Sequence, residues 1–316
     1  MPDRIELKRL LQSDELVASE LNATLPDFSK QILLHKDLEE RLPEKRNERV
    51  PEKVVFEKAR PALLIMGDSI QPPELDAWKG RLEQARHLLQ KAIPSVGRVE
   101  FQNHPTYDWN GTAWMIGKDV LVTNRHVALL FAERQLTKFV FRKNATLKQI
   151  KARVDLKEEH GTPDERELQV TEIIHIEEDR SDSPDVAFLR VIPADGTVAL
   201  PDPIPLSDST LNSQDLVAVI GYPSFDPEEL PSVAREVFGG IYSVKRLSPG
   251  MVMNPQESDS VSFTHDCSTM GGNSGSVVLS LTTGKAVGLH YAGVARTANY
   301  AINANVLQSL YQKYVT

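Results

Sequence analysis

The segment 268–276 reads S-T-M-G-G-N-S-G-S and sets a serine, Ser274, among closely spaced glycines. A serine hydroxyl is too weakly acidic to attack a peptide carbonyl unaided, so it needs a basic side chain and a carboxylate that orients that base. Glycines allow the close approach and the unusual dihedral angles that an oxyanion hole of backbone N–H groups requires. We therefore interpret Ser274 as a candidate nucleophile and the N–H groups of Gly272 and Ser274 as candidate oxyanion donors.

Two upstream segments supply the other side chains that such a serine needs. The segment 123–128 reads T-N-R-H-V-A and the segment 183–189 reads S-P-D-V-A-F-L, which provide His126 and Asp185. The order is histidine, aspartate, serine, with 59 residues from His126 to Asp185 and 89 from Asp185 to Ser274. An α/β-hydrolase has the order serine, acid, histidine, so this chain does not have that fold. The observed order is expected when histidine and aspartate come from one β-barrel and serine from a second.

These three segments carry a resemblance to a known family. Residues 95–316 resemble the chymotrypsin-fold, or trypsin-like, serine proteases, because T-N-R-H-V-A is similar to the family's T-A-x-H-hydrophobic string and G-N-S-G-S to its G-D-S-G-G string. The resemblance implies a mainly β fold of two antiparallel six-stranded barrels. It also implies a hydrolase, a serine endopeptidase that acts through an acyl-enzyme, with His126, Asp185 and Ser274 as the catalytic triad.

The serine segment is most similar to the bacterial glutamyl endopeptidase branch, whose string is S-T-x-G-G-N-S-G-S. The resemblance implies that Ser268 forms the base of the substrate pocket, and that Thr269 and His290, in the string G-L-H-Y-A-G, bind a substrate carboxylate. Ser268 stands where proteases that select Lys or Arg carry aspartate. We therefore expect glutamate before the scissile bond. The alternative is a pocket that keeps the histidine without selecting glutamate, and Ala292 departs from the glycine of the branch.

Asn273 precedes the candidate nucleophile, at the position where digestive relatives carry an aspartate. In those relatives the aspartate pairs with a new amino terminus that an activation cleavage releases. An asparagine side chain has no charge with which to form that ion pair. Activation of that kind is therefore not expected, and the N-terminal region becomes the candidate for control.

The first 60 residues differ in composition from the rest, with 12 Lys and Arg and 13 Asp and Glu. Their apolar residues recur at three- and four-residue steps, which predicts amphipathic helices followed by a charged linker. We divide the chain into this helical region (1–60), a connecting segment (61–94) with a helix over 73–93 that packs on the protease, and the protease domain (95–316). The N-terminal helices are a candidate interaction or autoinhibitory module.

Beyond residue 94 the sequence consists of short runs rich in Val, Ile and Thr between Gly, Pro, Asn and Asp. Ten such runs without intervening helices indicate an all-β barrel or sandwich. A helix over 305–314 is expected to end the chain. The expected strands are 96–101, 112–116, 120–123, 139–141, 170–176, 186–191, 216–220, 261–263, 276–281 and 286–290.

The composition also excludes several classes of function. The 316 residues carry a net charge of -8, whereas nucleic-acid-binding surfaces are usually net basic. No run approaches the roughly 18 apolar residues of a membrane helix. The single cysteine, Cys267, forms no internal disulfide, and we interpret it as a buried packing residue. The amino terminus is charged and lacks the apolar core of a secretion signal, so a bacterial cytoplasmic location is expected, with a secreted mature form as the alternative.

Other polar residues have simpler interpretations. His104, His160, His175 and His265 lack the spacing of metal ligands, so neither a metal nor a cofactor is predicted. Asp266 is interpreted as a turn residue near the pocket. A pseudoprotease that serves as a binding scaffold would require the loss of a catalytic residue, and none is lost. The expected partners are a protein or peptide substrate and, through the N-terminal helices, a second protein.

Overall fold

The computed structural model describes residues 60–180, 183–196, 199–225, 231–255, 261–294 and 298–315. The helical region predicted over 1–60 therefore lies, except for Arg60, outside the described residues. Within the described part of the chain, no helix is long and apolar enough to cross a membrane.

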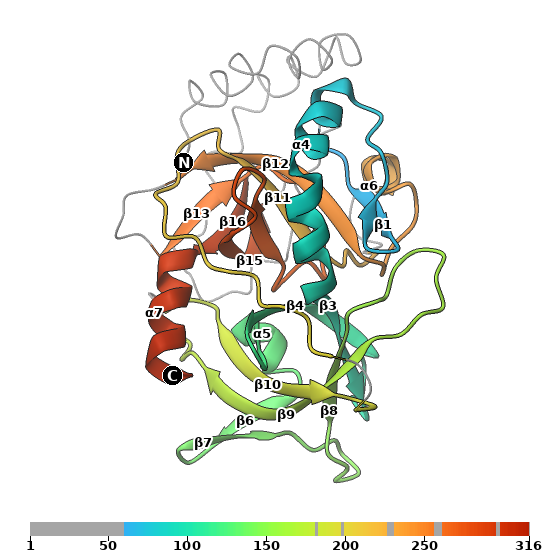
Figure 1. Cartoon of the computed structure of the whole chain (residues 1–316). Helices are drawn as coiled ribbons and strands as arrows, with labels where there is room; N and C mark the ends of the chain where they lie inside the picture. The colour runs from blue at the N-terminus through green and yellow to red at the C-terminus, as the bar shows by residue number, and fades with distance from the viewer. Residues whose placement is uncertain are drawn as a thin grey trace, which may run out of the picture.

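Six antiparallel strands form a first closed barrel, in the lower half of Figure 1. Its strand order is β10-β5-β4-β3-β8-β9. Its interior is a cluster of buried Val, Leu, Ile, Ala and Phe side chains, as expected of strands with one face turned to a core. The strands are β3 (Val96–Gln102), β4 (Trp109–Gly117), β5 (Val120–Thr123), β8 (Lys151–Asp155), β9 (Glu167–Ile176) and β10 (Ala187–Pro193).

The second barrel occupies the upper half of Figure 1, and its strand order is β11-β14-β15-β16-β13-β12. An additional pairing of β11 with β12 closes the ring. The predicted fold of two six-stranded antiparallel barrels is thus confirmed. The strands are β11 (Leu216–Gly221), β12 (Arg246–Asn254), β13 (Ser262–His265), β14 (Val277–Ser280), β15 (Ala286–Val294) and β16 (Ala298–Asn303).

A front unit precedes the first barrel and packs on the second. It consists of β1 (Leu63–Met66), β2 (Ser69–Ile70), the helix α4 (Asp76–Ala92) and the short 3-10 helix η2 (Ile93–Ser95). β1 pairs with β12, and Figure 1 shows α4 running from the second barrel toward the start of β3. The apolar face that predicts a helix over 73–93 is the face that α4 buries, including Trp78.

The C-terminal helix α7 (Ala304–Tyr314) contacts β15 and β16 of the second barrel and also packs on the first. The ring of Tyr311 meets Phe188 edge-on, and the ring of Tyr314 stacks on His175 with centroids 3.5 Å apart. The helix expected over 305–314 is therefore confirmed, and it ties the two barrels together. The remaining described elements are α5 (Arg125–Ala128), β6 (Ala132–Gln135), β7 (Lys138–Phe141) and α6 (Pro231–Phe238).

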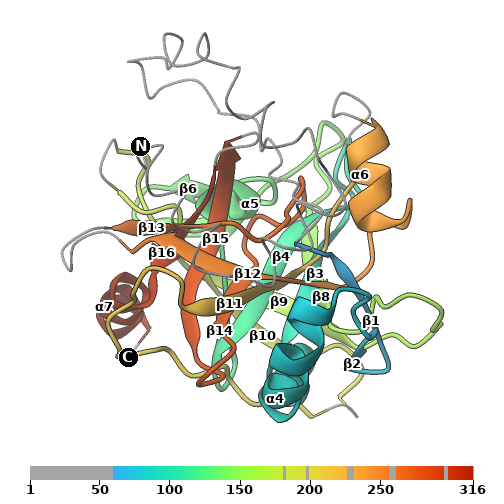
Figure 2. The same cartoon turned by 90° about the horizontal axis from the view of Figure 1, so that it is seen from above.

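The two barrels share one continuous apolar core. It includes Val122 and Phe188 from the first barrel, Val277 and Leu289 from the second, and the buried face of α4. Figure 2 shows the second barrel from above, with α4 and α7 on its flanks. Burial of such a surface stabilises the domain without a disulfide, and Cys267 is buried and free as predicted.

Candidate active site

Ser274 lies where the two barrels meet. The N–H of Thr112 in the first barrel donates to the carbonyl of Ser274 at 2.8 Å, and the N–H of Gly275 donates to the carbonyl of His290 at 2.9 Å. A Cβ on Gly275, whose φ is +87°, would lie 2.0 Å from the carbonyl oxygen of Thr112. Only a glycine at position 275 allows the two backbones to come this close, so Gly275 lets the two barrels pack together at Ser274.

His126 and Ser274 come together across this junction. His126 lies in α5, directly after β5, and its Nε2 is 2.8 Å from Oγ of Ser274. The serine is almost completely buried, whereas 45% of the histidine side chain is exposed. The imidazole therefore has hydrogen-bond contact with the hydroxyl on one side and access to the surface on another, as a general base that also protonates a leaving group requires.

Asp185 completes the arrangement from the loop directly before β10. Its Oδ2 is 2.6 Å from Nδ1 of His126, its Oδ1 accepts the backbone N–H of His126 at 3.1 Å, and its own carbonyl accepts from Asn124 Nδ2 at 2.9 Å. Burial opposes ionisation of this carboxyl, but His126 and, more weakly, Arg125 outweigh burial and hold the pKa of Asp185 below its usual value. The carboxylate is therefore ionised at neutral pH and orients the histidine.

The direction of the Gly272 N–H is fixed by the peptide group that joins Gly271 and Gly272. The carbonyl of Gly271 accepts from the N–H of Ser224 at 2.6 Å. In a trans peptide the C=O and the following N–H point in opposite directions, so the N–H of Gly272 points away from Ser224. Gly272 has a φ of +85°, and a Cβ here would lie 2.4 Å from the carbonyl oxygen of Tyr222. This predicted oxyanion residue is therefore a glycine for a geometric reason.

The N–H of Ser274 is oriented in the same way. The carbonyl of Asn273 accepts from the N–H of Ser276 at 2.9 Å, which directs the N–H of Ser274 to the opposite side. The Asn273 side chain is buried and donates to the carbonyl of Met270 at 3.2 Å. Asn273 thus closes the turn around the nucleophile with a neutral amide.

Ser268 and Thr269, two of the three predicted pocket residues, already donate their hydroxyl protons to protein groups. Oγ of Ser268 donates to the backbone carbonyl of Arg60 at 2.6 Å. Oγ1 of Thr269 donates to Oδ1 of Asn299 at 2.8 Å, and Nδ2 of Asn299 donates to the carbonyl of Cys267. A hydroxyl has one proton, so Thr269 can donate to a substrate only by releasing Asn299.

His290, the third predicted pocket residue, lies on β15 one strand from the nucleophile and is 1% exposed. Its Nδ1 is buried and has no hydrogen-bond partner among the described residues. Burial lowers the pKa of His290 well below its usual value. Repulsion between a protonated His290 and protonated His265 or His126 acts in the same direction, and a hydrogen bond with the backbone of Tyr300 opposes them. The imidazole is therefore neutral at neutral pH.

Asp266 is not the turn residue that the sequence suggests. Its Oδ2 accepts from Nε of Arg60 at 2.9 Å and from Nη2 of Arg60 at 2.7 Å, in a buried ion pair. The two residues are 206 positions apart, and neither belongs to a motif, so no sequence signal links them. His265, whose spacing in the sequence does not fit a metal ligand, lies completely buried in the second barrel.

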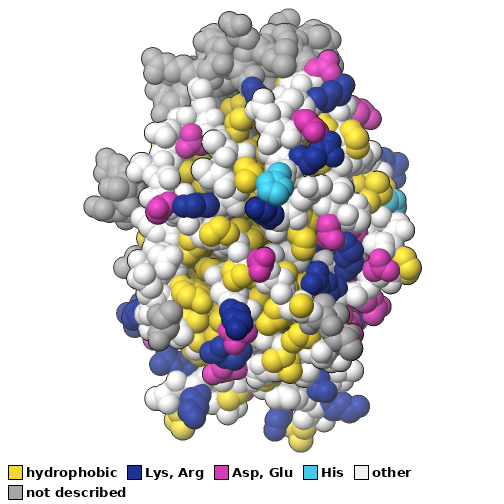
Figure 3. All heavy atoms as spheres, viewed as in Figure 1, with side chains coloured by type: hydrophobic (Ala, Val, Ile, Leu, Met, Phe, Trp, Pro, Cys, Tyr) yellow, Lys and Arg dark blue, Asp and Glu magenta, His cyan; other side chains and the backbone are white. Residues whose placement is uncertain are grey.

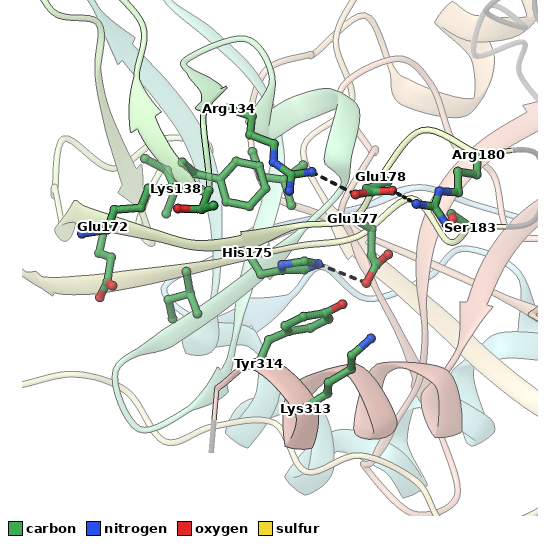
Figure 4. A pocket seen from close by; sticks show the side chains of 15 residues that line it. Arg134, Lys138, Glu172, His175, Glu177, Glu178, Arg180, Ser183, Lys313 and Tyr314 are labelled. Carbon is green, nitrogen blue, oxygen red and sulfur yellow. Dashed lines mark hydrogen bonds and ion pairs between the residues drawn. The ribbon is translucent and has the colours of Figure 1, made fainter.

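A polar groove of about 730 Å³ lies apart from the triad, between β7, β9 and the end of α7. Figure 4 shows Arg134 and Arg180 directed at Glu178, and His175 directed at Glu177 and stacked on Tyr314. These charged groups neutralise one another. On the face in Figure 3, basic and acidic side chains are likewise interspersed, so no field of one sign dominates it.

One group of three carboxylates among the described residues, Glu100, Asp155 and Glu158, is close enough to hold a metal ion. Arg98 pairs with Glu100 and Glu158, and Arg153 pairs with Glu100. Guanidinium groups therefore already pair with two of the three carboxylates, and Asp155 Oδ1 accepts the backbone N–H groups of Lys157 and Arg166.

The comparisons with known proteins agree with this geometry. The family model described as "Trypsin-like peptidase domain" matches residues 111–289. A protein of Lysobacter enzymogenes described as "Probable serine protease" is 26% identical over 276 residues, which span 79% of this chain and 71% of that protein.

Two solved structures are also similar. A mutant of Rv3671c from M. tuberculosis in an inactive form has a TM-score of 0.43 and 17% identity, over 72% of this chain and 89% of that one. Deg5 has a TM-score of 0.46 and 22% identity, over 72% of this chain and 93% of that one. At these TM-scores the assignment of the fold rests on the strand pairing described above. The matched residues hold His126, Asp185 and Ser274 and cover more than half of the sequence, so the chain belongs to the trypsin-like peptidase family.

Proposed function

We propose that the protein is a serine endopeptidase in which Ser274, His126 and Asp185 act as the catalytic triad. The observation that carries the proposal is the unbroken path of two hydrogen bonds, 2.8 Å from Ser274 Oγ to His126 Nε2 and 2.6 Å from His126 Nδ1 to Asp185 Oδ2. A pseudoprotease would need no such path, and its alternative role as a scaffold draws no support from this geometry.

The chemistry follows from these contacts. Ser274 Oγ attacks the scissile carbonyl carbon while its proton passes to His126 Nε2, and the charged imidazole is stabilised by Asp185. The N–H groups of Gly272 and Ser274 stabilise the oxyanion of the tetrahedral intermediate. Collapse of the intermediate breaks the C–N bond, the proton on His126 goes to the leaving amine, and an acyl-enzyme remains. Water, deprotonated by His126, then releases the acid and restores Ser274.

For specificity, we propose a preference for glutamate before the scissile bond, with His290 as the main contact. Two observations support this proposal. Nδ1 of His290 is buried and has no hydrogen-bond partner among the described residues, and position 268 holds no acidic residue. The hydroxyl of Ser268 is committed to Arg60, so the contribution of Ser268 is to shape the pocket. Thr269 is the second contact, at the cost of its bond to Asn299.

A neutral His290 gives this preference a pH dependence. A carboxylate in the pocket favours the charged imidazole, so binding of glutamate is coupled to the uptake of a proton by His290. The coupling favours glutamate substrates at lower pH. Binding of an uncharged substrate side chain requires no proton uptake by His290.

A set of peptides that differ only at the residue before the scissile bond tests this specificity. We expect the glutamate peptide to have the highest kcat/KM, with lysine and arginine peptides the poorest. Equal turnover of glutamate and leucine peptides would remove the glutamate preference and leave the endopeptidase assignment standing.

We also propose that residues 1–60 recruit or restrain the protease, because this region joins the described part of the chain at Arg60, beside the pocket. Comparing the full chain with residues 51–316 tests the idea. Higher peptidase activity of the shorter chain or loss of a bound protein is expected. Identical activity and identical protein binding would contradict it.

A further inference from the structure

Arg60 contacts the second barrel through Asp266 and Ser268, and the helix α4 through Trp78. Its guanidinium pairs with Asp266, its backbone carbonyl accepts from Ser268, and the guanidinium lies over the ring of Trp78, 5.3 Å from the ring centroid. Only 5% of its side chain is exposed. Arg60 is therefore built into the wall of the pocket by both its side chain and its main chain.

Asp266 also forms hydrogen bonds with β12 of the second barrel. While Oδ2 faces Arg60, Oδ1 accepts the N–H of Met251 on β12 at 2.6 Å, and the N–H of Asp266 donates to the carbonyl of Met251 at 3.2 Å. The carboxylate thus joins the front unit, β12 and the start of the segment that leads through Ser268 to Gly272. Movement of Asp266 would move the base of the pocket with it.

A second anchor lies two residues further along the chain. Ala62 packs in a small buried cluster with Met270 and Phe238, and its carbonyl accepts from Nη1 of Arg246. Arg246 also donates to the carbonyl of Phe238 at 2.6 Å and to that of Ile241 at 2.8 Å. The segment 60–62 therefore contacts both ends of the segment 266–270, directly before the oxyanion glycines.

These contacts supply what Asn273 cannot. Asn273 is neutral, so it forms no ion pair that would hold the segment before the nucleophile in place. That segment is held instead by the ion pair between its own Asp266 and Arg60, which lies outside the barrel strands. The two N–H groups of Arg60 that reach the carboxylate have a fixed fork geometry, which restricts orientation more than a single point charge does.

We propose that Arg60 is a positioning residue for catalysis, whose contacts with Asp266 and Ser268 hold the pocket base and the approach to Gly272 in the competent arrangement. This inference rests on the proposed function and adds a requirement to it. The protease domain depends on a residue outside its two barrels, at the point where the N-terminal region joins.

The difficulty for any test is that a buried ion pair also affects stability. Removing one partner leaves a buried unpaired charge and destabilises the fold, whereas replacing both partners by apolar residues is often neutral. The double variant Arg60→Met with Asp266→Leu therefore separates stability from positioning. Arg60→Lys is a milder second variant, because it keeps the charge and loses the fork.

Lys157→Met is the matched control. Lys157 is largely buried and pairs with Asp68, in the turn between β1 and β2, at 2.7 Å and with the buried Glu159 at 3.4 Å. The control removes an ion pair of the same front unit at a position away from the segment 266–270. It reports what general loosening of that unit does to activity.

The experiment measures kcat and KM for one peptide, the melting temperature, and the rate at which a fluorophosphonate labels Ser274, all in the full chain. For the double variant we expect a moderately lower melting temperature, because Asp266→Leu also removes the acceptor of the Met251 N–H. Measured well below that temperature, kcat/KM should be lower by about 10-fold or more, since small displacements in a site cost this much. Arg60→Lys should lower kcat/KM by a smaller factor than the double variant does. Lys157→Met should keep kcat/KM within about twofold well below its melting temperature.

Wild-type kcat/KM in both Arg60 variants would overturn the positioning role. A loss of kcat/KM in Lys157→Met as large as in the Arg60 variants would overturn it too, because the effect would then be one of general stability. Failure of the proposed function is distinguishable: in that case the wild-type chain itself neither cleaves the peptide nor reacts with the fluorophosphonate.

Discussion

His265 and His290 lie ring against ring inside the second barrel, with centroids 5.4 Å apart and planes at 66°. Both are buried, and neither nitrogen of His265 has a hydrogen-bond partner among the described residues. Burial lowers the pKa of His265 to about 3. The second barrel therefore holds two neutral imidazoles side by side, and protonating either one places a charge beside the other.

This pair predicts acid sensitivity of the fold. Between pH 6.5, the ordinary pKa of histidine, and about 3, the unfolded chain binds a proton at His265 and the folded chain does not. The free energy of unfolding therefore decreases as the pH falls through this window. His265→Phe should make the decrease smaller, as measured by urea unfolding from pH 7 to pH 4. The exposed His160→Gln is the control, and an unchanged pH slope in His265→Phe would contradict this assignment.

His290→Ala should affect glutamate substrates selectively. If protonated His290 binds the substrate carboxylate, the variant should lose about 10-fold or more in kcat/KM for a glutamate peptide and little for a leucine peptide. In the wild type, the ratio of the two kcat/KM values should fall as the pH rises from 6 to 9, because binding then costs a proton uptake. A ratio that is independent of pH and of His290 would show that another group selects the substrate.

Much of this molecule could be predicted from its sequence because the informative signals are local. The strings around His126, Asp185 and Ser274 and nine of the ten apolar runs identify the barrels, whereas the run 139–141 lies in β7, which pairs with β6 outside both barrels. Gly272 and Gly275 have the positive φ that such a turn requires. The C-terminal helix follows from its apolar period. These features depend on residues close together in the chain.

The features that the sequence did not predict depend on tertiary contacts. β12 contains Pro249 and Gly250, which predict a turn, yet both lie in a strand that pairs with β11 and β13. A Cβ on Gly250 would lie 2.5 Å from Oδ1 of Asp266, so this glycine serves the contact with the pocket segment. β8 reads K-A-R-V-D and alternates charged with apolar residues, but it holds only one β-branched residue, so it is not among the runs rich in Val, Ile and Thr. The role of Arg60 depends on a partner 206 residues away.

Asp185→Asn should preserve the fold and remove most of the activity. The amide can occupy the same place but does not stabilise a charged His126, and it favours the wrong tautomer of the imidazole. We expect kcat to fall by about 10⁴-fold, as in other serine proteases with this arrangement. Steady-state kinetics with a circular dichroism control measures this. Retention of more than about a tenth of the activity would mean that Asp185 does not orient the base.

Lys245 predicts a stability change at alkaline pH. Its Nζ donates to the carbonyls of Leu156 at 2.6 Å and Ile93 at 3.1 Å, and it is completely buried. Burial lowers the pKa of Lys245 to about 8, against an ordinary 10.5 and against the attraction of Glu159. Between these values the unfolded chain binds more protons, so the contribution of Lys245 to the free energy of unfolding should increase with pH.

Urea unfolding at pH 7.5, 9 and 10 measures this contribution as the difference between the wild type and Lys245→Met. The difference should change with pH in the predicted direction over this range. The variant should be less stable than the wild type throughout, because it loses the hydrogen bonds of Lys245 to Leu156 beside the first barrel and to Ile93 in the front unit. A difference that is constant from pH 7.5 to 10 would contradict the lowered pKa.

The central claim is that Ser274 is a nucleophile activated by His126. Its most direct test is to treat the folded full chain with a fluorophosphonate and locate the adduct by mass spectrometry of its peptides, alongside Ser274→Ala and His126→Ala. We predict one adduct, on Ser274, in the wild type, none in Ser274→Ala, and a strongly slowed reaction in His126→Ala. An unlabelled wild type, or peptide cleavage by Ser274→Ala at the wild-type rate, would contradict the claim.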